Sequence, residues 1–182
     1  IYEESDEAWV DLFQLGNTYA IDYTNDFSFL KESNSILWAS EKDGWRDLYQ
    51  ISLEGKPEVL ITKGEYDVID LKYIHNKEGF VYYLASPDNA TQKYLYKTNL
   101  NGNGKNKLLS PASLKGSHDY SFSSNGNYAA HTFSNHFTPY SKEFISIANH
   151  KALTEEESIL RNVKKLEKKS TTEFFSITTA DN

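Results

Sequence analysis

Residues 27–62 read FSFLKESNSILWASEKDGWRDLYQISLEGKPEVLIT, and this stretch decides the fold because its pattern occurs twice more along the chain. It opens with a short alternating strand, passes a polar turn and enters a more apolar strand, Ile36-Leu37-Trp38-Ala39. A third strand, a turn at Glu54-Gly55 and a closing strand complete the unit. Aromatic and β-branched residues favour each of these segments as β-strands.

The same order of strands and turns fills residues 69–110 and 120–154. The third strands begin at Leu48, Leu95 and Phe144, which are spaced by 47 and 49 residues. Four short strands that recur at a period of this size are typical of β-propeller blades. A β-sandwich is the alternative, but it does not predict one pattern repeated three times. We therefore predict an all-β fold, a partial propeller of about three four-stranded blades over residues 27–62, 69–110 and 120–154.

Propellers close with about four to eight blades, so three blades predict that further blades lie outside this chain. Residues 1–26 are expected to form the end of a preceding blade and a connecting loop. After Thr154 the pattern changes, and Thr154-Glu155-Glu156-Glu157 resembles a capping box that starts a short helix. Residues 171–178 are then expected to form a strand that leads out of the propeller.

Composition excludes several classes of function. The chain has 182 residues, a net charge of −7 and no cysteine. An acidic chain without a basic face is a poor partner for nucleic acid, and no apolar run is long enough to span a bilayer. The absence of cysteine excludes disulfides, thiolate metal sites and a cysteine nucleophile. No cofactor is indicated.

The sequence carries no catalytic motif, and we expect no catalytic, metal-binding or cofactor-binding residue in it. Ser117-His118-Asp119 holds the residue types of a catalytic triad, but neighbouring strand side chains point to opposite faces, so we interpret it as a blade-opening loop. His131 and His136 lack an evident third ligand and are interpreted as surface or blade-edge residues. Glu3 and Glu4 are paired carboxylates that could bind an amine, but solvated terminal residues are the more ordinary interpretation.

Several segments resemble the N-terminal domains of the dipeptidyl peptidase IV family, in the same order. Residues 40–49, SEKDGWRDLY, resemble its S-E-x-D-G-aromatic-x-x-L-Y signature. Residues 120–126, YSFSSNG, resemble its S-x-S-F-S-P-D-G turn, with Ser124-Asn125 in place of Pro-Asp. Residues 3–11 resemble the segment that enters the late blades. Residues 174–181, FFSITTAD, resemble the strand that opens the α/β-hydrolase domain of that family.

The resemblance implies a parent protein in the prolyl oligopeptidase clan (S9 serine peptidases), a periplasmic or secreted hydrolase that removes dipeptides from peptide substrates. Residues 155–182 would then link the propeller to the hydrolase domain, and the family's catalytic serine, aspartate and histidine would follow the chain. Many family members form homodimers. Phe13 takes the position of an aromatic residue that lines the S2 subsite, and a packed loop aromatic is the alternative.

Two functions remain open at this point. The chain could be the non-catalytic propeller segment of such a peptidase, which gates substrate access and docks the hydrolase domain. Alternatively, it could be a propeller binding or scaffold module of the TolB type, without an enzymatic partner domain.

Overall fold

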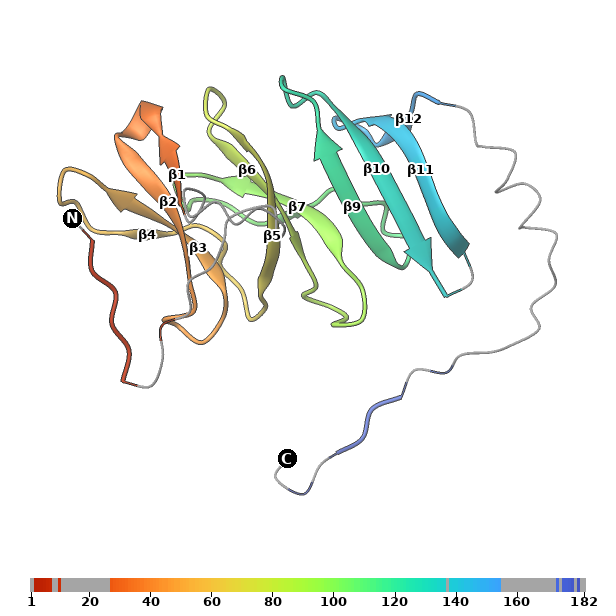
Figure 1. Cartoon of the computed structure of the whole chain (residues 1–182), viewed down its shortest axis with the longest axis horizontal. Helices are drawn as coiled ribbons and strands as arrows, with labels where there is room; N and C mark the ends of the chain where they lie inside the picture. The colour runs from red at the N-terminus through yellow and green to blue at the C-terminus, as the bar shows by residue number, and fades with distance from the viewer. Residues whose placement is uncertain are drawn as a thin grey trace.

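A computed structural model shows three four-stranded antiparallel sheets (Figure 1). The structure describes residues 2–7, 10, 27–136, 138–154, 173, 175–178 and 180. The first sheet holds β1 (Phe27–Leu30), β2 (Ser35–Ser40), β3 (Asp47–Ser52) and β4 (Val59–Leu60), with the single 3-10 turn η1 (Lys31–Ser33) between β1 and β2. The second holds β5 (Val68–His75), β6 (Phe80–Ala85), β7 (Tyr94–Asn99) and β8 (Lys107–Leu108). The third holds β9 (Ser117–Phe122), β10 (Tyr128–Asn135), β11 (Thr138–Ser146) and β12 (Lys151–Ala152).

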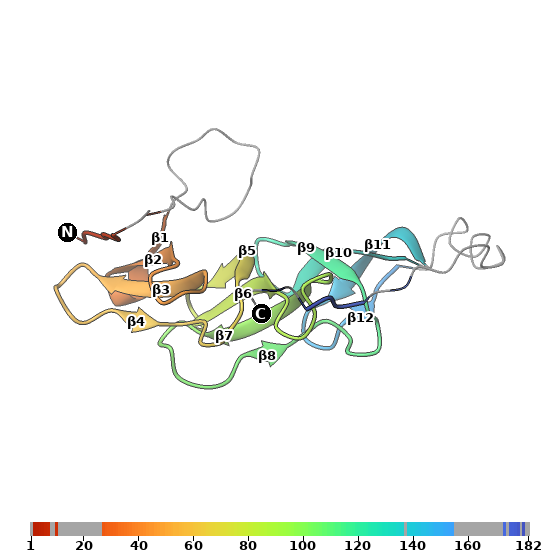
Figure 2. The ribbon, with the colours of Figure 1, turned by 90° about the horizontal axis from the view of Figure 1, so that it is seen from below.

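Each sheet is a simple meander in which every strand pairs with the next one along the chain. Figure 2 shows the three sheets following one another in chain order along the molecule. This arrangement confirms the predicted fold class, an all-β partial propeller of three four-stranded blades.

One hydrogen-bond motif recurs on the third strand of every sheet. A side-chain hydroxyl that follows the fourth strand accepts a hydrogen bond from a backbone N–H of the third strand. The donor is the second residue of β3 and of β7, but it lies near the end of β11, which begins at Thr138 and not at Phe144 as expected. The pairs are Leu48 N with Thr62 Oγ1 at 2.8 Å, Leu95 N with Ser110 Oγ at 2.8 Å, and Phe144 N with Thr154 Oγ1 at 3.1 Å. The motif satisfies a backbone donor just beyond the end of the short fourth strand, and its recurrence shows that the three sequence repeats are structural equivalents.

The second sheet is buried on both faces, which explains why its strand β6 is apolar without alternation. Val81 and Tyr83 pack into the apolar cluster shared with the first sheet. Tyr82 and Leu84 point the other way, into the cluster shared with the third sheet. Successive side chains of a strand alternate between faces, so a strand between two sheets needs apolar residues at every position.

The exposed fractions of the equivalent residues Leu48, Leu95 and Phe144 show which of the three sheets lacks a neighbour on this face. Leu48 and Leu95 are 0% and 1% exposed because each faces the following sheet, whereas Phe144 is 53% exposed. Phe144 therefore lies on the face of the third sheet that points away from the second.

Two expectations concern the C-terminal end of the chain. The helix expected after Thr154 lies outside the described residues. The strand expected over residues 171–178 stays a prediction: the described residues 175–178 pair with no strand of the described part, and Phe175 and Ile177 are 79% and 74% exposed. A strand forms when its backbone groups pair with a neighbour, and the described residues offer this segment none.

The interpretation of Ser117-His118-Asp119 as a blade-opening loop is wrong. These residues begin β9, and the His118 N–H donates to the Lys93 carbonyl at 3.0 Å across the seam with the second sheet. No helix in the described part of the chain is long and apolar enough to cross a membrane.

Candidate functional site

The paired carboxylates at the start of the chain behave differently from each other. Glu3 is exposed, whereas Glu4 accepts hydrogen bonds from Trp38 Nε1, at 2.6 Å, and from the Ser40 hydroxyl. The Tyr2 ring adds an edge-on contact with Trp38, with 6.1 Å between the ring centroids. The interpretation of both glutamates as solvated is therefore wrong for Glu4, which fastens the N-terminal segment to β2.

Phe13, the one substrate-binding candidate from the sequence, lies outside the described residues. Its role stays a prediction.

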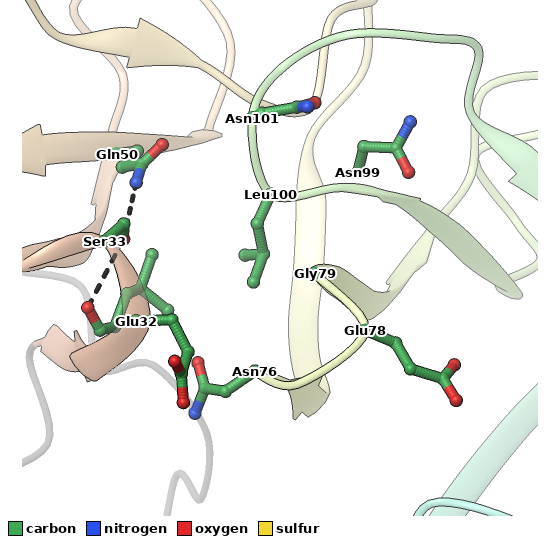
Figure 3. Close-up of a pocket in the computed structure, with 10 residues that line it drawn as sticks. Glu32, Ser33, Gln50, Asn76, Glu78, Gly79, Asn99, Leu100 and Asn101 are labelled. Carbon is green, nitrogen blue, oxygen red and sulfur yellow. Dashed lines mark hydrogen bonds between the residues drawn. The ribbon is translucent and has the colours of Figure 1, made fainter.

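A polar pocket of about 290 Å³ lies between the first and second sheets (Figure 3). One wall comes from η1 and β3, and the other from the turn between β5 and β6 and the end of β7. The lining residues are Leu30, Glu32, Ser33, Gln50, Asn76, Glu78, Gly79, Asn99, Leu100 and Asn101. Gln50 is held in place because its amide donates to Ser33 Oγ at 2.8 Å.

Carboxylate and amide groups dominate this lining. Glu32 and Glu78 supply two negative charges, and no lysine or arginine is among the lining residues. Such a surface suits N–H donors and cationic groups, as an extended polypeptide would present them. From the sequence, these positions were predicted only as polar turns. The pocket itself was not predicted, because its two turns lie 40 or more residues apart and come together only when the first and second sheets pack on each other.

A second cluster lies inside the third sheet, around three histidines. His118 Nδ1 and His131 Nε2 are 2.9 Å apart, and His131 Nδ1 is 2.9 Å from Glu143 Oε1. His150 Nε2 is 2.9 Å from the Tyr120 hydroxyl. His131 is 1% exposed, so its interpretation as a surface residue is wrong.

Burial governs the protonation of this cluster. It lowers the pKa of His118 and of His131 to about 4, because a charged imidazolium loses hydration inside the sheet. Burial likewise lowers the pKa of His150 and raises that of the Tyr120 hydroxyl. The cluster is not evident in the sequence, because its members pair across 12 to 30 residues.

His118 has no catalytic-triad geometry. Its two ring nitrogens contact His131 and the Leu114 carbonyl, which lies 2.8 Å from Nε2. Asp119 points to the opposite face of β9, where Lys72 Nζ lies 2.8 Å from its Oδ1. The buried His118 and the ion-paired Asp119 thus lie on opposite faces of β9, as the alternation of side chains along a strand requires.

Comparison with known proteins places this geometry in a family. The family model described as the dipeptidyl peptidase IV (DPP IV) N-terminal region matches residues 1–140. A probable dipeptidyl-aminopeptidase B of Aspergillus niger is 33% identical over 89 residues, which cover 48% of this chain and 10% of that protein. Dipeptidyl peptidase 4 of Trichophyton equinum is 22% identical over 161 residues, covering 87% of this chain and 20% of that protein.

A solved structure agrees. The crystal structure of Porphyromonas gingivalis dipeptidyl peptidase 4 superposes with a TM-score of 0.64 at 26% identity, over 79% of this chain and 20% of that one. The matched regions thus amount to between a tenth and a fifth of these three relatives. Since the family model covers all three sheets up to residue 140, the chain belongs to the dipeptidyl peptidase IV N-terminal region family.

Proposed function

We propose that this chain is the non-catalytic propeller segment of a dipeptidyl peptidase IV-like serine exopeptidase, in which it gates substrate access and docks the hydrolase domain. The observation that carries the proposal is the succession of three equivalent stacked sheets, which superposes on dipeptidyl peptidase 4 of Porphyromonas gingivalis. The parent protein would be a periplasmic or secreted hydrolase that acts on peptides and forms homodimers.

A gate must be stiff, and the seams between the sheets supply stiffness. At the seam between the second and third sheets, the Tyr73 and Phe122 rings stack in parallel, with 5.1 Å between their centroids. Beside them Lys72 joins Asp70 and Asp119, with N–O distances of 2.7 and 2.8 Å. A wall held in this way admits a narrow, extended peptide and excludes a folded protein.

The first experiment uses the full-length protein that carries this chain. We expect it to release dipeptides from Gly-Pro chromogenic substrates and from short peptides with an N-terminal X-Pro. The kcat/KM should fall steeply for a folded protein that bears the same N-terminus. Absence of dipeptide release would refute the peptidase role and favour the binding or scaffold module.

A second experiment separates gating from catalysis. The Phe122→Ala variant loosens the seam, so it should raise the kcat/KM for the folded substrate while leaving that for the chromogenic substrate unchanged. Leu53→Ala, at a residue that is 54% exposed in a turn of the first sheet, is the matched control. Equal effects of Phe122→Ala on both substrates would refute the gating role.

A further inference from the structure

His131, Glu143 and His150 bring three potential metal ligands together in the third sheet. Their donor atoms all lie within 4.8 Å of one another. His131 and Glu143 are cross-strand partners on β10 and β11, and His150 lies in the turn between β11 and β12. His131 is buried, whereas the Glu143 side chain is 37% exposed, so the cluster is closed on the inside and reachable from solvent at the carboxylate.

The hydrogen bonds leave two lone pairs facing each other. The Leu114 carbonyl can only accept, so His118 Nε2 carries the hydrogen and its Nδ1, in the neutral ring, must accept from His131 Nε2. A neutral His131 then has a bare Nδ1. This atom lies 2.9 Å from Glu143 Oε1, which is also an acceptor.

Two acceptors at that distance repel each other unless a positive charge lies with them. Either an additional proton or a metal ion can supply it.

The backbone at His150 is an independent indication that its side chain matters. His150 has a φ of 54°, in the left-handed region, and Gly55 and Gly102 hold the corresponding turns of the other two sheets with φ of 74° and 68°. A residue with a Cβ atom is strained in this conformation, whereas glycine is not. The imidazole that takes this position turns inward, and its centroid lies 4.6 Å from that of His131.

We propose that His131, Glu143 and His150 bind a divalent transition-metal ion, with zinc as its representative. Two imidazoles and one carboxylate form a donor set that zinc accepts, and water would complete the coordination at the exposed side. Ligands around a tetrahedral zinc lie roughly 3.4 Å apart, so small side-chain rotations bring the three donors into place.

The surrounding hydrogen bonds fit this role. When His131 binds through Nδ1, its Nε2–H donates to His118, which in turn donates to the Leu114 carbonyl. The Tyr120 hydroxyl holds His150. Partners of this kind fix the tautomer and orientation of metal-binding histidines. A bound ion would tie β10 and β11 to the turn before β12, a strand of only two residues.

The experiment is a calorimetric titration of the chain with zinc chloride at pH 7.5, after treatment with a chelator. We expect one saturable site per chain, and zinc should raise the midpoint of thermal unfolding. Glu143→Gln keeps the shape of the side chain and removes its charge. His150→Gly removes a ligand and places glycine where φ is positive. Each should weaken zinc binding by about tenfold or more.

His75→Gln is the matched control, because His75 faces Glu78 at 3.8 Å in a His–Glu pair outside this cluster. The zinc affinity of the His75→Gln variant should equal that of the unaltered chain. Circular dichroism checks that each variant is folded. The absence of a saturable site in the unaltered chain would overturn the proposal. Undiminished zinc binding by both Glu143→Gln and His150→Gly would overturn it as well.

Discussion

The buried carboxyl group of Asp47 makes the stability of this chain depend on pH in an unusual direction. Asp47 lies at the start of β3, is 1% exposed and accepts a hydrogen bond of 2.5 Å from the Thr62 hydroxyl. Burial raises the pKa of Asp47 from 3.8 to about 7; the Thr62 hydrogen bond opposes this rise, and the charges of Asp43 and Asp67 contribute to it. The folded state therefore holds a proton that the unfolded chain has already released.

The sign and size of the effect follow from this difference. Between about pH 4 and pH 7 the folded state binds one more proton than the unfolded state, so the contribution of Asp47 to stability falls as pH rises. A shift of about three pKa units corresponds to about 4 kcal/mol, at 1.4 kcal/mol per unit. The contribution is fully present below the unfolded pKa and is lost once the pH passes the folded pKa.

The Asp47→Asn substitution isolates this contribution. An asparagine oxygen still accepts from Thr62, and the side chain no longer titrates. The difference in free energy of unfolding between Asp47→Asn and the unaltered chain should move in favour of the variant by up to about 4 kcal/mol from pH 4 to pH 7.5.

Urea unfolding followed by tryptophan fluorescence, at several pH values across this range, measures the difference. Other titrating groups cancel because they are common to both proteins. Asp88→Asn, at an exposed carboxyl group, is the control for the exchange of an aspartate for an asparagine. A difference for Asp47→Asn that stays constant with pH would refute the reasoning.

Three further predictions concern stability at fixed pH, and urea unfolding tests each of them. Leu84→Ala should lower the free energy of unfolding by about 2–5 kcal/mol, because Leu84 is 0% exposed between the second and third sheets. Leu53→Ala, at an exposed residue, should lower it by less than about 0.5 kcal/mol. Equal losses would contradict the proposed core. Ser110→Ala should lower the free energy of unfolding by about 1–3 kcal/mol, because it removes a hydrogen-bond partner from both Leu95 N and the Tyr120 hydroxyl. Ser113 is exposed, so Ser113→Ala should leave the stability unchanged. An unchanged stability for Ser110→Ala would show that the recurring hydroxyl motif is dispensable. Gly102→Ala should lower the free energy of unfolding by about 1–3 kcal/mol more than Gly55→Ala. Both glycines have a positive φ, but only at Gly102 would the new methyl group meet other atoms, Val59 Cγ1 at 2.5 Å and the Leu60 carbonyl oxygen at 2.6 Å. Similar losses for the two variants would argue against the close packing of this turn on β4.

The sequence predicted the sheets well because the signal is repeated. The strand patterns that begin at Leu48, Leu95 and Phe144 recur with turns between them, so an error in one repeat is corrected by the other two. The structure also explains the continuous apolar run of β6, because this strand is buried on both faces.

The errors have a common physical cause, which is long-range pairing. His118 was assigned to a blade-opening loop because adjacent residues cannot form a catalytic triad, and His131 to the surface or a blade edge because no third ligand is evident near it in sequence. Their partners, one another and Glu143, lie 12 and 13 residues away on neighbouring strands, and the register that joins them is fixed by the whole sheet. Asp47 is a similar case, since nothing near it in sequence distinguishes it from the exposed Asp43.

The strand expected near the C-terminus stays a prediction for a related reason. Residues 175–178 have the composition of a strand, but composition does not supply the neighbour that a strand must pair with. The pocket between the first two sheets was missed because turn residues line it, and turns carry no periodic signal.

A structure of the full-length protein that carries this chain, determined by cryo-electron microscopy or crystallography, tests the central claim most directly. The account predicts that the three sheets are consecutive blades around a common channel that opens towards a hydrolase domain. It also predicts that a further blade covers Phe144, which is 53% exposed here. Sheets that close on each other as a sandwich, or a Phe144 left exposed in the full-length protein, would contradict it.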